Sequence, residues 1–199
     1  MSMLVFDGDC RLYSDSLIYS GGVRHRTYKL FALDRDAHVG FIGIVAPAQR
    51  FIRDQLQVQN RKDWCRTTLS CPPTEYCMVL LVDYDARKLL VWESPDDGTT
   101  DTTPEVMEFR TLVLGNSTFC AIANYQFQAG FGSTAHQPHR AVSAELHRIV
   151  DYVDRVTAES SVTPAINWLT DGELHPHVTV SRPVLTRESM GLPPLSPRN

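Results

Sequence analysis

The stretch MSMLVFDGDCRLYSDSLIYSGG, residues 1–22, decides the fold expected for this chain. Residues 3–6 form a short apolar run, and Asp7-Gly8-Asp9 after it is a turn signal. Residues 11–16 then resume as a second strand-like run. Two such runs joined by a tight turn predict a β-hairpin at the start of the chain.

Strands and helices follow one another in blocks after this hairpin. A helix is expected over 47–58, and a clearer one over 143–156, where Leu146, Ile149 and Val153 recur at helical spacing. Further strands are expected over 23–33, 39–45, 78–82, 89–92, 106–113, 119–123, 165–169 and 177–180, with loops over 60–76 and 94–104. Because the strands come in hairpins between helices, the order favours an α+β domain over a doubly wound sheet.

The composition is that of an ordinary globular domain. The 199 residues are 43% hydrophobic and 21% charged, with a formal net charge of -4. We expect one domain over 1–185 and a proline-rich tail over 186–199 that is disordered or extended. The absence of a basic excess gives no support to a nucleic-acid partner. No apolar run is long enough to cross a membrane, and the N-terminus lacks a signal-peptide pattern, so we expect a cytoplasmic protein.

The cysteines and histidines do not form a metal-binding pattern. Cys65, Cys71 and Cys77 are six residues apart, which fits neither a zinc ribbon nor a zinc finger. All five cysteines are therefore interpreted as reduced thiols. His175 and His177 would share one face of a strand, but a third ligand is missing, so no metal or cofactor is predicted.

Four residues in the first quarter of the chain could carry chemistry together. Removal of Met1 would make Ser2 an N-terminal residue, whose hydroxyl is a nucleophile and whose α-amine is a base. Asp15 and Lys29 could tune that amine, and a backbone N–H at Gly43 could stabilise an oxyanion. Asp15 and Lys29 fit equally well as a structural ion pair on neighbouring strands.

The run MSMLVFDGDCRLYSDSLIYSGG…YKLFAL resembles the start of proteasome β-type subunits and their small bacterial and phage relatives. That family, the N-terminal nucleophile hydrolases, has a four-layer αββα sandwich of two antiparallel sheets. By this resemblance Ser2 is the nucleophile, Asp15 the acid, Lys29 the catalytic lysine and Gly43 the oxyanion glycine.

The resemblance covers about residues 2–60 and 119–162. In its second part, Gly132-Ser133 resembles the family's glycine-serine before a helix pair. Asp154 and Thr157 resemble the residues that support the nucleophile's amine. The chain departs from the family in having serine as nucleophile, a shorter first hairpin and a shorter segment from Ser133 to Asp154.

Two functions remain open from the sequence. The first is a peptidase or amidohydrolase that uses Ser2 on a peptide or protein substrate. The second is an inactive relative that keeps the fold for assembly or binding. In both cases the resemblance implies a homo-oligomer, such as the rings that family members usually form, in a bacterial cytoplasm or in a host cytoplasm if phage-encoded.

Overall fold

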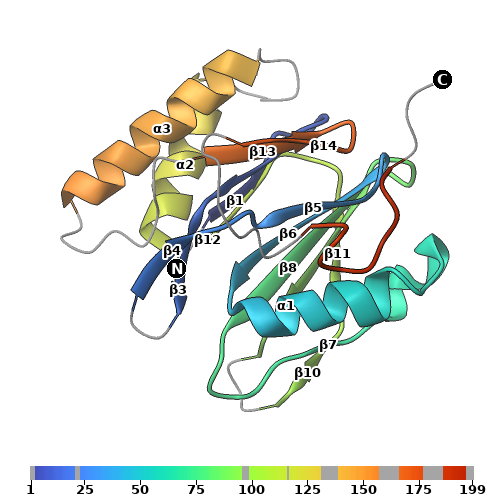
Figure 1. Cartoon of the computed structure of the whole chain (residues 1–199). Coiled ribbons are helices and arrows are strands. Elements are labelled where there is room, and N and C mark those ends of the chain that lie inside the picture. The colour runs from blue at the N-terminus through green and yellow to red at the C-terminus, as the bar shows by residue number, and fades with distance from the viewer. Residues whose placement is uncertain are drawn as a thin grey trace.

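The computed structural model describes residues 3–20, 23–95, 99–115, 117–130, 139–156, 166–176 and 186–195. Over these residues the chain is an α+β protein with two five-stranded antiparallel sheets (Figure 1). Two small two-stranded sheets accompany them. The α+β class expected from the sequence is confirmed.

The first sheet contains the predicted hairpin. Its strand order is β12-β1-β2-β13-β14. The strands are β1 (Met3–Phe6), β2 (Leu12–Asp15), β12 (Leu112–Gly115), β13 (Ile166–Thr170) and β14 (Glu173–His175). The Asp7 carboxylate closes the β1–β2 turn by accepting the backbone N–H groups of Asp9, Cys10 and Arg11 at 2.9, 3.1 and 3.0 Å.

The second sheet has the order β11-β9-β8-β6-β5. Its strands are β5 (Leu30–Asp34), β6 (Ala37–Gly43), β8 (Cys77–Asp83), β9 (Lys88–Glu93) and β11 (Glu105–Glu108). The small sheets pair β3 (Leu17–Ser20) with β4 (Val23–Arg26), and β7 (Leu69–Ser70) with β10 (Asp101–Thr102).

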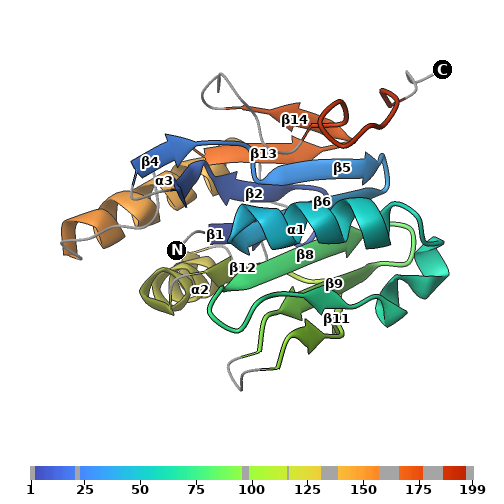
Figure 2. The ribbon, with the colours of Figure 1, turned by 60° about the horizontal axis from the view of Figure 1, so that its bottom comes forward.

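The helices lie on different sides of the two sheets (Figures 1 and 2). Helices α2 (Ser117–Gly130) and α3 (His139–Val156) lie together beside the first sheet, and their apolar side chains share a cluster with Met3, Val5 and Tyr13. Helix α1 (Val45–Phe51) continues as a π-helix, Ile52–Leu56, and packs on the second sheet. A short 3₁₀ helix, Arg61–Arg66, follows in the segment expected to be a loop.

Side chains of both five-stranded sheets meet in one buried apolar cluster. Leu4, Phe6 and Leu12 of the first sheet lie there with Leu30, Ile42 and Leu80 of the second. At Gly40 a Cβ atom would lie 2.6 Å from Cδ2 of Leu4, so a larger residue there would require the Leu4 side chain to shift. Apolar side chains from both sheets therefore share one buried cluster.

Three expected strands were wrong in type or length. Residues 119–123, expected to be a strand, belong to α2. Phe119 and Ala123 are one helical turn apart, and both are buried in the cluster between this helix and the first sheet. The expected strand 23–33 is divided into β4 and β5, which lie in different sheets. The expected strand 106–113 is likewise divided between β11 and β12. The expected strand 177–180 lies outside the described residues.

The described part of the tail, residues 186–195, packs on the domain. The Arg187 guanidinium donates to the carbonyl oxygens of Ala32 and Leu33, both at 2.9 Å. Met190 is buried in the cluster beneath α1. These contacts fix the segment against β5, whereas composition alone indicated a disordered or extended tail.

Candidate functional site

A group of buried polar side chains lies at the end of the first sheet where β1 begins and β2 ends. Ser14 and Asp15 close β2, and Ser16 follows directly. Thr27 and Lys29 lie between β4 and β5, and Asn167 lies on β13 as the register partner of Ser14. All six are 0% exposed, in a core that is otherwise mostly apolar. Burial of so many polar groups costs stability, which marks this end as a candidate site.

Asp15 and Lys29 form the centre of this group. The Lys29 Nζ atom lies 2.9 and 3.0 Å from the two carboxylate oxygens of Asp15. The same Asp15 Oδ1 accepts the backbone N–H of Met3 at 2.9 Å. The carboxylate therefore connects the start of β1 to the lysine, and the residue bonded to Met3 on its N-terminal side is Ser2.

The local backbone explains why Lys29 reaches Asp15. The Thr27 N–H donates to the carbonyl of Ser16 at 2.8 Å, and the Phe41 N–H donates to the carbonyl of Lys29 at 3.1 Å. Residues 27–29 therefore pass from the β3–β4 hairpin into the second sheet while remaining hydrogen-bonded to both. This crossing points the lysine at the end of β2.

Burial lowers the pKa of Lys29, while the charge of Asp15 and its hydrogen bond to the ammonium act in the opposite direction. The Asp15 carboxylate, within 3.0 Å of Nζ through both oxygens, stabilises the ammonium form. The pair can therefore hold a cation beside the start of β1 and influence any ionisable group placed there.

Gly43 ends β6 in a backbone conformation that favours glycine. Its φ is +89°, and a Cβ atom would lie 2.1 Å from the carbonyl oxygen of Tyr76. The next N–H, of Ile44, donates to that oxygen at 2.8 Å, and α1 begins at Val45. Phe41, whose N–H is bonded to the Lys29 carbonyl, is two residues before Gly43 on β6. Gly43 is therefore about 7 Å along the strand from that hydrogen bond.

The structure thus brings Asp15, Lys29 and the start of β1 together. Gly43 lies at the end of β6, the strand that is hydrogen-bonded to Lys29 through Phe41. Ser2, Ser133 and Thr157 lie outside the described residues. Asp154 lies in the last turn of α3, and only its backbone is described.

Sequence reasoning missed the start of α2 at this end of the molecule. Gly115 pairs with Met3 across β12 and β1, and α2 begins two residues later at Ser117, which is exposed. The resemblance placed Gly132-Ser133 before a helix pair. In the sequence these residues fall between α2 and α3, and the helix pair begins earlier, after Gly115. The run Gly115-Asn116-Ser117 contains asparagine and serine, which are common at helix starts, and this signal could have revealed the helix.

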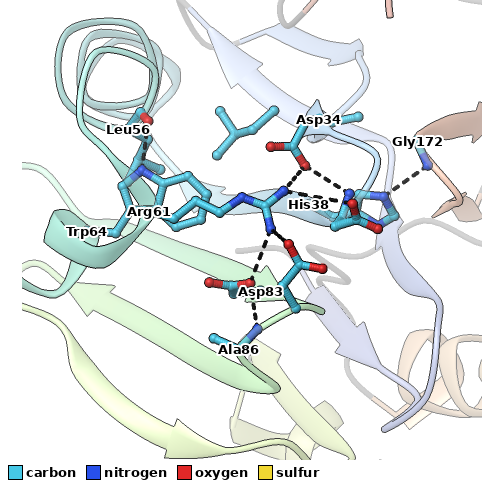
Figure 3. Close-up of polar contacts among 12 residues, drawn as sticks. Asp34, His38, Leu56, Arg61, Trp64, Asp83, Ala86 and Gly172 are labelled. Atoms are coloured by element: carbon cyan, nitrogen blue, oxygen red, sulfur yellow. Dashed lines mark hydrogen bonds and ion pairs between the residues drawn. The ribbon is translucent and has the colours of Figure 1, made fainter. Parts of the chain in front are cut away.

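A second polar network lies at the opposite end of the sheets (Figure 3). The Gly172 N–H donates to His38 Nε2 at 3.0 Å, so the proton of the neutral ring is on Nδ1, 2.9 Å from the Tyr84 hydroxyl. The Tyr84 hydroxyl in turn donates to the Cys10 carbonyl at 3.2 Å. Burial lowers the pKa of His38 to about 4. The imidazole connects both sheets as a neutral group.

Arg61 joins three segments beside this network (Figure 3). Its guanidinium lies 2.6 Å from Asp34, 4.0 Å from Asp36 and 3.7 Å from Asp83, and it also pairs with Asp85. One arginine therefore balances carboxylates from the β5–β6 and β8–β9 turns and holds the 3₁₀ helix against them. We interpret this network as structural.

Within the described ranges no group of three or more His, Cys, Asp or Glu side chains could hold a metal ion. His175 instead stacks on Trp168, with ring centroids 5.3 Å apart, and His177 lies outside those ranges. No helix among the residues searched is long and apolar enough to cross a membrane. Comparison with protein-family models finds no match, and comparison with curated proteins finds none either.

Proposed function

We propose that this chain is a proteasome-like N-terminal nucleophile hydrolase with a four-layer αββα sandwich and with Ser2 as its nucleophile. The observation that carries the proposal is the fully buried Asp15–Lys29 pair whose carboxylate also holds the N–H of Met3. A buried ion pair is a poor way to gain stability, because desolvation offsets most of the attraction. Its place beside Met3 is better explained by a role in a reaction at the neighbouring residue, Ser2.

The fold supports the proposal. Two antiparallel five-stranded sheets share one apolar cluster, α1 packs on the second sheet, and α2 and α3 lie beside the first (Figure 2). These contacts are those that a helix–sheet–sheet–helix order requires.

The proposed reaction follows from the groups at this end of the molecule. With Met1 removed, the Ser2 hydroxyl attacks an amide carbonyl carbon, and its proton passes to the Ser2 α-amine. The oxyanion accepts a hydrogen bond from the backbone at Gly43, and the Lys29 ammonium favours the neutral form of the nearby amine. The C–N bond then breaks, and the leaving amine takes the proton from the α-ammonium. Water hydrolyses the resulting ester with the α-amine again as base.

The chemical test has two parts. Intact-mass measurement on the purified protein should show a chain that lacks Met1. An acylating β-lactone probe should then add one mass increment to the wild-type protein and to Ser70→Ala, which alters an exposed serine elsewhere. It should add none to Ser2→Ala or to Lys29→Ala. A free Ser2 amine that is not acylated, with no Ser2-dependent peptide hydrolysis, would favour the second candidate, an inactive relative that serves assembly or binding.

The proposal includes self-association. Tyr125 on α2 and Tyr152 on α3 are 69% and 51% exposed and line a shallow groove between the two helices with Ile122 and Ile149. An apolar helix surface of this kind supports burial against a second copy of the chain. Light scattering at micromolar concentration should give a mass above that of one chain, and a strict monomer would contradict this part.

A further inference from the structure

The β3–β4 hairpin lies immediately beside the proposed site. Its base is closed by the hydrogen bond from the Thr27 N–H to the carbonyl of Ser16, the residue next to Asp15. It extends from the end of the molecule where β1 begins and where β6 leads into α1 (Figures 1 and 2). A substrate held at the start of β1 would therefore have this hairpin as one of its walls.

The hairpin carries basic residues and no acidic ones. Arg24, His25 and Arg26 are consecutive on β4, and residues 17–30 contain no aspartate or glutamate. The His25 and Arg26 side chains are exposed, and Arg26 lies opposite Leu17 in the register. The ion pairs found among the described residues do not include Arg26. The Arg26 side chain is exposed and can be reached by a ligand from solvent.

Four turns at the other end of the sheets are rich in acidic residues. The turns β1–β2, β5–β6, β8–β9 and β13–β14, with Arg61 packed against them, hold eight acidic side chains and five basic ones. These are Asp7, Asp9, Asp34, Asp36, Asp83, Asp85, Asp171 and Glu173 against Arg11, Arg35, Arg61, Arg87 and Lys88. The excess of negative charge in these turns lies away from the proposed site, whereas the hairpin beside that site is basic.

We infer that the substrates of the proposed site are acidic peptides, with carboxylate side chains near the cleaved bond that contact the β4 face of the hairpin. This inference rests on the proposed function. Exposed charges at the rim of a site mainly increase the association rate and discriminate against like-charged ligands, and salt weakens both effects. The preference should therefore appear as affinity and kcat/KM for acidic peptides that fall with ionic strength.

Binding is measured on the Ser2→Ala variant so that the result does not depend on turnover. Three fluorescein-labelled peptides of equal length carry Glu, Gln or Lys at the same positions, and fluorescence anisotropy is read in 20 and 200 mM NaCl. We expect the Glu peptide to bind about 5- to 10-fold more tightly than the Gln peptide at 20 mM, with most of the difference lost at 200 mM. The Lys peptide should bind most weakly.

Two charge-reversal variants make the test specific. Arg26→Glu should abolish the preference for the Glu peptide. Arg110→Glu makes the same change at an exposed position next to Gly8, at the opposite end of the molecule, and should leave the preference intact. Equal binding of the three peptides, or equal effects of the two variants, would overturn the inference.

The same peptides separate this inference from the proposed function. Wild-type protein that cleaves all three peptides at equal kcat/KM retains the proposed function and refutes the acidic preference. Protein that binds the Glu peptide selectively through Arg26 but cleaves none of them supports the binding preference and refutes the hydrolase.

Discussion

Replacing Lys29 by methionine should be among the most destabilising single changes in this protein. The substitution keeps the length and most of the volume of the side chain but removes the Nζ that contacts both Asp15 oxygens at 2.9 and 3.0 Å. It leaves the carboxylate fully buried without its cation. Breaking a buried ion pair in this way costs about 3–5 kcal/mol, a large part of the 5–15 kcal/mol typical of a domain.

A double substitution tests whether the charge, rather than the packing, causes the loss. Asp15→Asn with Lys29→Met removes both charges and keeps an amide oxygen that can accept the Met3 N–H. We expect this variant to lie within about 2 kcal/mol of wild type, because two neutral groups avoid most of the desolvation cost. Urea unfolding at pH 7, followed by the fluorescence of the three tryptophans, gives each free energy of unfolding.

The exposed pair Glu145–Arg148 on α3 provides a matched control. Arg148→Met should change the free energy of unfolding little, since exposed ion pairs are screened by water. The reasoning fails if Lys29→Met costs less than about 1 kcal/mol, or if the double variant loses as much as the two single variants together. Under the proposed function the double variant should regain stability without regaining β-lactone acylation, which separates the structural contribution of Lys29 from its chemical one.

Three further predictions concern the rest of the fold. Because the pKa of His38 is lowered to about 4 from 6.5, unfolding takes up a proton between these values, and stability present above pH 6.5 should fall by about 3 kcal/mol as the pH drops to 4. Urea unfolding across this range should show that fall in wild type and lose it in His38→Gln. Gly43→Ala should cost more than about 2 kcal/mol, because its Cβ would overlap the Tyr76 carbonyl. Gly191→Ala also has a positive φ, +70°, but meets no atom within 4 Å, and should cost only about 1 kcal/mol in the same assay. Arg61→Ala should cost about 1 kcal/mol in 20 mM salt and less in 1 M salt, since it removes the cation among Asp34, Asp36, Asp83 and Asp85. A cost that does not change with salt would contradict this interpretation of the network.

The sequence was sufficient where the local pattern and the tertiary contacts agree. The β1–β2 hairpin is encoded by two apolar runs around Asp7-Gly8-Asp9, and the structure shows the Asp7 side chain closing that turn. Helix α3 is encoded by its periodic apolar face, and Leu146, Ile149 and Val150 are all buried. These elements depend on neighbours in the sequence, so a single sequence can predict them.

The sequence was insufficient where a strand changes sheets. Residues 23–33 and 106–113 each look like one strand, and each is divided because the chain leaves one sheet and joins another. The choice of sheet depends on partners far away in the sequence, such as β6 for β5 and β1 for β12. The strand predicted at 119–123 was wrong for a related reason. Aromatic and branched residues favour strands locally, but here the contacts with the first sheet stabilise a helix.

The candidate site was predictable only in part. Asp15 and Lys29 could be named as a pair because both fall in segments that the sequence predicts to be strands, 11–16 and 23–33. The burial of Ser14, Ser16, Thr27 and Asn167 around them could not be predicted, because serine, threonine and asparagine are usually exposed. Their burial depends on tertiary contacts between distant segments, which a local sequence pattern does not predict.

The buried polar end also bears on how Lys29 should be interpreted. Along the same sheet, Leu4, Phe6 and Leu12 fill the space between the sheets with apolar side chains, which shows that this architecture accepts an apolar core. An ion pair and four neutral polar residues in place of such side chains lower the stability that the fold could otherwise reach. A purely structural ion pair gives no reason for this loss, whereas a site that must hold a cation beside the start of β1 does. Under the proposed function, apolar substitution of both Asp15 and Lys29 should produce folded chains that the β-lactone probe no longer acylates.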